Sequence, residues 1–200
     1  MPDLVVVALA FAAIFVVELP DKTFIATLVL STRYRPILVW IGVGLAFAVQ
    51  TGIAVAFGKV AGLLPTTWVH LGVIVMFLAG AVILTRAARS ADEEEAETED
   101  EYAAKARDAH GLRVVGVCFL VLFAAEWGDL SQLLTLSLVA KYDDPLSVFL
   151  GAWGALLTVS GLAVLVGRVL LNHVKLSLLH YLGATVCVIL AGVTLVELVA

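Results

Sequence analysis

Two stretches decide the fold: FAAIFVVELPDKTF at residues 11–24 and FLVLFAAEWGDLSQ at residues 119–132. Each stretch places a glutamate inside an apolar run, with an aspartate three residues later and a hydroxyl residue two positions further on. These residues are Glu18, Asp21 and Thr23 in the first stretch, and Glu126, Asp129 and Ser131 in the second. Because residues three apart share one face of a helix, each stretch predicts a helix that carries a pair of carboxylates on one side.

The rest of the chain is too apolar to cover a water-facing surface. Of 200 residues, 62% are hydrophobic and 14% are charged, and the mean hydropathy is +1.07. Soluble domains carry about a quarter charged residues. The composition therefore predicts an all-α integral membrane protein with the lipid bilayer as its main partner. There is no basic patch with interleaved aromatic residues, which argues against nucleic-acid binding.

The apolar runs predict six transmembrane helices, at about residues 4–31, 37–63, 67–86, 112–140, 146–171 and 176–200. We expect the first to be a permanent span, because Asp3 stands where a cleaved signal would carry positive charge. Pro20 interrupts the first span, and Gly128 stands at the matching place in the fourth.

The run between the third and fourth helices is strongly acidic. Nine of the 17 acidic residues lie within residues 92–108. Such runs are usually solvated and disordered, so we expect a linker here, with residues 102–107 as a candidate short interfacial helix. The predicted organisation is a three-helix repeat at 1–87, an acidic linker at 88–111 and a second three-helix repeat at 112–200, in one compact transmembrane domain.

The basic residues predict the orientation. Nine lysines and arginines fall on the side of the acidic linker and two on the other side, while Lys22 lies inside a span. The positive-inside rule then places the linker in the cytoplasm and both termini outside, in a multi-pass protein of the plasma membrane.

The two halves resemble each other beyond the acidic stretches. The segment from Thr51 to Lys59 matches the segment from Ser160 to Arg168, and Gly42 matches Gly151. Because each half holds three spans, the second must cross the membrane in the opposite sense to the first. Inverted repeats are typical of secondary transporters, whose site lies at the repeat interface and whose halves exchange conformations in alternating access.

The intramembrane carboxylates predict a cation site. An aspartate at a helix centre costs about 2.5–3.5 kcal/mol to insert, so these acids must face a cation, water or protons rather than lipid. Oxygen ligands favour Mn²⁺, Ca²⁺ or Mg²⁺ over Zn²⁺. The predicted ligands are Glu18, Asp21, Thr23, Glu126, Asp129, Ser131 and Gln132. We assign interfacial or structural roles to His70, His110, His173 and His180, with no histidine near either motif.

These motifs resemble the family of Golgi calcium/manganese transporters and their bacterial relatives. That family carries Glu-x-Gly-Asp-Lys/Arg-Ser/Thr once in each of two three-span halves. The resemblance covers nearly the whole chain and implies transport of Mn²⁺ or Ca²⁺ in exchange for protons, with the motif residues as ligands. The chain departs from the pattern at Pro20, where the family has glycine, and at Leu130, where it has a basic residue.

The sequence thus predicts a Mn²⁺ exporter that exchanges the ion for protons, with no enzymatic activity and no cofactor. Three alternatives are open: a Ca²⁺/H⁺ antiporter, an exporter of small metabolites, and a metal-sensing or signalling membrane subunit without flux. One chain contains both halves, so a monomer suffices in principle, and a homo-oligomer is left open.

Overall fold

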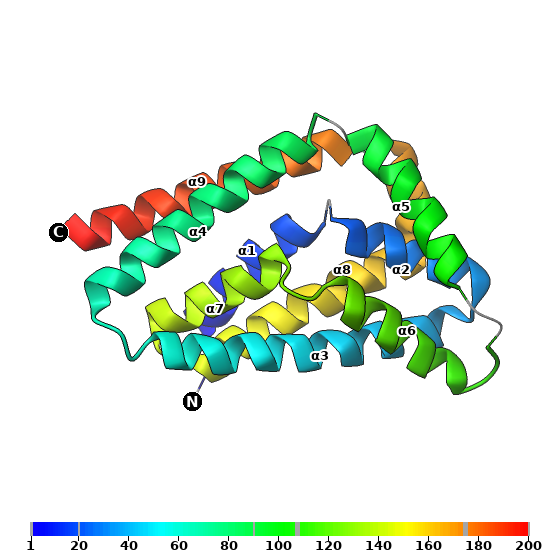
Figure 1. The fold of residues 1–200 in the computed structure, drawn as a ribbon, viewed down its shortest axis with the longest axis horizontal. Helices are drawn as coiled ribbons and strands as arrows, with labels where there is room; N and C mark the ends of the chain where they lie inside the picture. Colours follow the sequence, from blue (N-terminus) through cyan, green and yellow to red (C-terminus); the bar gives the residue numbers. More distant parts are fainter. Residues whose placement is uncertain (1, 20, 90, 107–108, 174–175, 200) are drawn as a thin grey trace.

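The computed structural model describes residues 2–19, 21–89, 91–106, 109–173 and 176–199. These residues form nine helices and no strand (Figure 1). The helices are α1 (Leu4–Glu18), α2 (Lys22–Arg33), α3 (Pro36–Ala61), α4 (Thr66–Ala87), α5 (Ala91–Lys105), α6 (Arg113–Ala125), α7 (Leu130–Tyr142), α8 (Pro145–His173) and α9 (Leu176–Val199). The all-α prediction is confirmed.

Four helices, α3, α4, α8 and α9, contain stretches that are long and apolar enough to cross a membrane. The remaining apolar helices form two bent pairs. The α1–α2 pair bends by 71° and the α6–α7 pair by 74°. By length and composition, the described chain thus has four candidate membrane spans, or up to six if each bent pair is one span. The bends fall in the first and fourth predicted spans, where the sequence places Pro20 and Gly128. Pro20 itself lies outside the described residues.

Glycines let the helices of the two halves approach closely. α1 packs against α8, and α3 packs against α6, α7 and α8. A Cβ added to Gly151 of α8 would lie 2.4 Å from the carbonyl oxygen of Val7 in α1. A Cβ on Gly42 of α3 would lie 2.6 Å from the carbonyl oxygen of Val115 in α6. Small residues permit this backbone contact, which replaces hydrophobic driving force between membrane helices.

Both termini lie at the end of the molecule opposite α5 (Figure 1). The backbone N–H of Asp3 donates a 2.7 Å hydrogen bond to the Ser147 hydroxyl at the start of α8. At the same end, the Lys141 ammonium of α7 lies 3.0 Å from the Glu197 carboxylate of α9, and it donates a 3.0 Å hydrogen bond to Thr194. These contacts join the segment before α1 to α8, and α7 to α9, far from the acidic linker.

The acidic linker is helical, so the prediction of a disordered run is wrong over the described residues. α5 packs against α2 and also contacts α9. Thr98, Tyr102 and Ala106 are spaced four residues apart and are less exposed than Asp100 and Glu101; Tyr102 is 2% exposed. Burying this stripe stabilises the docked helix. Burial, together with nearby acids such as Glu126, raises the pKa of the Tyr102 phenol.

Replacing Gly151 by alanine tests the packing of α1 on α8. The new methyl group would overlap the α1 backbone, and such overpacking costs about 1–3 kcal/mol. We expect the thermal unfolding midpoint of the purified protein in detergent to fall. Gly192→Ala is the matched control, because a Cβ there meets nothing within 4 Å. Equal midpoints for both variants would contradict the close contact.

Replacing Tyr102 by alanine tests the docking of α5. Removing a buried aromatic ring costs about 3 kcal/mol, so α5 should open far more often. We expect amide hydrogen exchange in residues 91–105 to accelerate at least about tenfold, with α3 and α8 unchanged. Tyr181→Ala, which removes a ring that is 46% exposed on α9, is the control. Unchanged protection of α5 would show that Tyr102 does not hold it.

Candidate metal centre

The two bends place all four motif acids at helix ends. Glu18 is the last residue of α1, and Asp21 directly precedes α2. Glu126 directly follows α6, and Asp129 directly precedes α7. In the second bend Gly128 has φ +79°, a left-handed conformation that glycine adopts without steric cost. Each motif therefore interrupts its helix, and the interruption places the ends of the helix backbone next to the carboxylates.

Helix ends suit both a carboxylate and a cation. The N-terminal ends of α2 and α7 carry partial positive charge beside Asp21 and Asp129, whereas the C-terminal ends of α1 and α6 present carbonyl oxygens. Each aspartate is also held by its own motif. The Thr23 hydroxyl donates to Asp21 Oδ2 at 3.3 Å, and the Ser131 hydroxyl donates to Asp129 Oδ2 at 3.1 Å. The hydroxyl two residues on thus orients the aspartate in both motifs.

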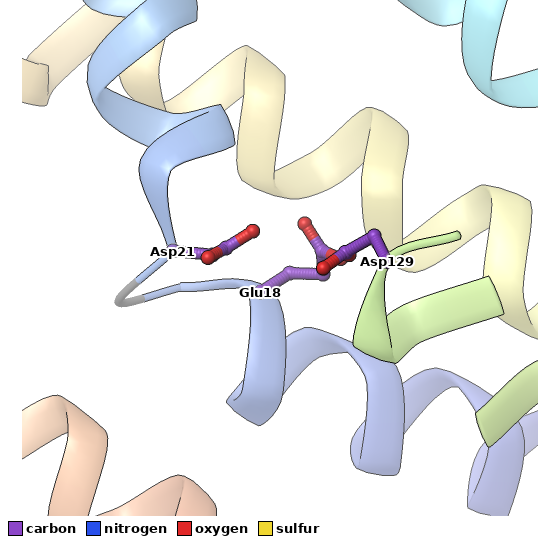
Figure 2. Close-up of side chains that lie close together, drawn as sticks. All are labelled: Glu18, Asp21 and Asp129. Atoms are coloured by element: carbon purple, nitrogen blue, oxygen red, sulfur yellow. The ribbon is translucent and has the colours of Figure 1, made fainter. Parts of the chain in front are cut away.

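Three carboxylates from the two motifs converge. Glu18, Asp21 and Asp129 each offer one oxygen, and these oxygens all lie within 4.8 Å of one another. Figure 2 shows the three side chains pointing toward a common centre. Ligands on opposite sides of a Ca²⁺ ion at 2.3–2.6 Å are at most about 5.2 Å apart. The spacing therefore matches oxygens that share a single divalent cation.

These carboxylates lie at the wall of a cavity of about 570 Å³. Segments from both halves and from the linker line it: Val17, Glu18, Asp21, Lys22, Ile25, Ile83, Leu84, Arg86, Ala87, Glu97, Thr98, Glu101, Asp129, Leu130 and His180. Glu18 is 1% exposed, and its Oε2 has no hydrogen-bond partner among the described residues. A buried polar atom without a partner is costly, which favours an ion, water or a proton at this position.

Glu126, the fourth acid, is set apart from the other three. It is 3% exposed, and neither of its carboxylate oxygens has a hydrogen-bond partner of good geometry among the described residues. It adjoins a separate cavity of about 10 Å³, the space of roughly one water molecule, which Gln50, Thr51 and Thr135 also line. The structure thus brings together three of the four predicted acids and leaves Glu126 outside this group.

The hydroxyl group of each motif nevertheless lies near the glutamate of the other motif. The Thr23 hydroxyl of the first motif lies beside the carboxyl group of Glu126, and the Ser131 hydroxyl of the second lies beside that of Glu18. Thr23 is 1% exposed and Ser131 is 7% exposed. Each hydroxyl thus donates to its own aspartate and lies near the glutamate of the other motif.

Gln132 braces the second bend. Its amide N–H donates a 2.7 Å hydrogen bond to the carbonyl oxygen of Glu126, and its amide oxygen accepts one of 3.3 Å from the N–H of Gly128. The side chain was predicted as a ligand. In this structure both ends of the amide are engaged by the backbone, so it fixes the geometry of the break.

Positive charge at the cavity comes from the first half. Lys22 lies on the cavity wall, and its Nζ is 3.5 Å from the carbonyl oxygen of Ala125 at the end of α6. Arg86, at the end of α4, lines the same cavity, whereas the second motif contributes the apolar Leu130. The charge around the three carboxylates is therefore uneven between the halves, as the departure at Leu130 predicts.

Sequence reasoning missed two contributions to the cavity. His180, from α9, is 4% exposed and lines the cavity, although no histidine lies near either motif along the sequence. Glu97 and Glu101, from the linker helix, line it as well. The available signal for His180 was its position inside the sixth predicted span, since an ionisable residue within a span usually marks a functional site.

Comparison with known proteins gives matches over most of the chain. A family model described as the divalent cation/proton antiporter GDT1 matches residues 6–92 and 114–200. GDT1-like protein 1, chloroplastic, of Oryza sativa subsp. indica is 31% identical over 213 residues, covering 96% of this chain and 62% of the rice protein. The chain thus spans less than two thirds of the length of this relative. No solved structure matches the chain significantly.

Bacterial relatives match over most of their own length. GDT1-like protein sll0615 of Synechocystis sp. is 31% identical over 196 residues, covering 86% of this chain and 91% of that protein. A Vibrio cholerae protein named "Putative manganese exporter" is 28% identical over 192 residues, covering 94% of this chain and 90% of that protein. With the family model matched over both halves, the chain belongs to the GDT1 family of divalent cation/proton antiporters.

Proposed function

We propose that this chain is a secondary transporter that exports a divalent cation, Mn²⁺ in the first place, in exchange for protons. The observation that carries the proposal is the group of three carboxylates, Glu18, Asp21 and Asp129, whose oxygens lie within 4.8 Å of one another beside a cavity. The group draws on both family motifs, so neither half could form it alone.

Charge repulsion explains why a cation and protons would compete there. Two carboxylates about 4.8 Å apart repel each other by about 3.5 kcal/mol at an effective dielectric constant of 20. The burial of Glu18 and the closeness of the three groups make their full ionisation unfavourable without a counter-charge beyond those of Lys22 and Arg86 on the cavity wall. A divalent cation supplies that charge, and so do protons on the same oxygens. Binding of one therefore displaces the other, which is the chemical basis of exchange.

The proposed alternating access uses two inverted repeats, residues 1–87 and 112–200, joined by the linker at 88–111. Three observations support this division. The family model matches two segments, 6–92 and 114–200, and each contains one bent helix pair, at 71° and 74°. In addition, the Trp153 indole donates a 3.0 Å hydrogen bond to the carbonyl oxygen of Gly44. These two positions are equivalent in the repeat, so their contact fits a twofold axis between α3 and α8.

The cavity suggests which side the site faces. Its wall includes Arg86, Glu97 and Glu101, which lie toward the α5 end. The opposite end is held together by the Lys141–Glu197 ion pair. The structure is therefore best described as open toward the linker, which the positive-inside rule assigns to the cytoplasm. We propose that this is the state that loads the ion inside the cell.

The choice of Mn²⁺ draws on the relative named a manganese exporter. Oxygen ligands suit Ca²⁺ equally well, so a Ca²⁺/H⁺ antiporter is the second candidate. A sensor without flux is the third, favoured by the contact of the acidic helix α5 with the cavity. We propose the plasma membrane as its location, following the topology that the basic residues predict. The rice relative is named as chloroplastic.

Binding measurements test the three carboxylates. We expect Asp21→Asn and Asp129→Asn each to weaken Mn²⁺ binding to the detergent-purified protein at least about tenfold, because a neutral amide removes one charged ligand. Asp143→Asn makes the same chemical change at an exposed position at the end of α7, where the left-handed φ of 49° also suits asparagine. It should bind as the unchanged protein does. Equal affinities for all four proteins would rule out this site.

Flux in proteoliposomes tests the exchange. With Mn²⁺ inside and a pH-sensitive dye as reporter, we expect Mn²⁺ efflux to drive proton uptake, and Asp129→Asn to abolish both. Mn²⁺ affinity should fall as the pH is lowered, because protons compete for the same oxygens. Ca²⁺ efflux that exceeds Mn²⁺ efflux would favour the second candidate. Mn²⁺ binding without any flux would favour the sensor and contradict the transporter.

A further inference from the structure

His180 occupies a position that neither motif of the family supplies. It belongs to α9, is 4% exposed, and lines the same cavity as Glu18, Asp21 and Asp129. Among the described part of the chain, the three carboxylates form the candidate ligand group. His180 stands in the wall of the same cavity, outside that group.

The packing of α9 on α1 fixes the level of this histidine. A Cβ on Gly183 would lie 3.4 Å from the carbonyl oxygen of Val16 and 3.7 Å from the Cα of Val17. The α9 backbone therefore touches α1 in the turn that ends at Glu18.

The direction of the two helices then places His180 beside the break. α1 runs from the terminal end toward the centre of the molecule, and α9 runs from the α5 end back toward the termini (Figure 1). His180 precedes Gly183 by three residues, or about 4.5 Å along the helix axis. Moving that far from Val16 and Val17 toward the α5 end reaches the level of the α1–α2 break. His180 is thus level with Glu18 and Asp21.

An imidazole at this place changes which ions the site prefers. Ca²⁺ takes oxygen ligands almost exclusively, whereas a neutral imidazole nitrogen is a good ligand for first-row transition ions. We propose that His180 donates an imidazole nitrogen to the divalent cation held by Glu18, Asp21 and Asp129, and thereby makes the site prefer Mn²⁺ to Ca²⁺. This inference rests on the proposed cation binding. The imidazole completes the coordination from the cavity side.

Pulsed electron paramagnetic resonance of bound Mn²⁺ tests the nitrogen ligand directly. The full chain in detergent, labelled with ¹⁵N-histidine, is loaded with Mn²⁺ and its electron spin-echo modulation is recorded. We expect a ¹⁵N coupling from a directly bound imidazole. His180→Gln should lose this coupling, and His70→Gln, which changes a histidine of α4 outside the cavity lining, should keep it. Mn²⁺ bound by the unchanged protein without a ¹⁵N coupling would overturn the inference and leave the proposed function intact.

Ion preference supplies the second readout. In His180→Gln we expect Mn²⁺ affinity to fall by about tenfold or more while Ca²⁺ affinity stays within about twofold, because only the nitrogen ligand is lost. An equal loss for both ions would mean that His180 only supports the fold, and would overturn the inference. The spectrum of the unchanged protein decides the question even if the variant fails to fold. Absence of any Mn²⁺ or Ca²⁺ binding by the unchanged protein would instead remove the proposed function itself.

Discussion

The mutual repulsion of carboxylates held inside a membrane is the constraint on which this structure depends. Glu18, Asp21 and Asp129 bring their oxygens within 4.8 Å of one another, although each charge would be costly in hydrocarbon. Such a group is stable only if helix ends, hydroxyl donors, protons or a cation offset the charge. The structure meets this requirement with the two bends, the hydroxyls of Thr23 and Ser131, and the cavity beside the acids.

The broken helices solve the problem through backbone geometry. A continuous helix would satisfy its own N–H and carbonyl groups and leave none to face the site. The breaks release them at the level of the acids, and Gln132 then holds the second break by bonding both of its sides. Close contacts at Gly151 and Gly42 bring the half-helices near enough for the acids of one half to meet those of the other.

The remaining parts of the cavity come from segments without any motif. α5 covers its outer part with Glu97 and Glu101, and α9 contributes His180. A strongly acidic helix attracts cations at long range, which is a separate effect from the proposed coordination at the three carboxylates. In the proposed function, α5 attracts the cation, and the carboxylates beside the two breaks coordinate it.

The sequence by itself determined the apolar class, the span positions and the paired acids. The predicted ranges 37–63 and 67–86 differ by only a few residues from α3 and α4, because long apolar runs leave little choice of structure in a bilayer. Only the tertiary structure decided that Glu126 stands apart, that Gln132 braces the backbone and that the acidic linker folds into a helix. Those outcomes depend on contacts between segments distant in the chain, such as Gly183 against Val16, and periodicity and composition carry no record of such contacts.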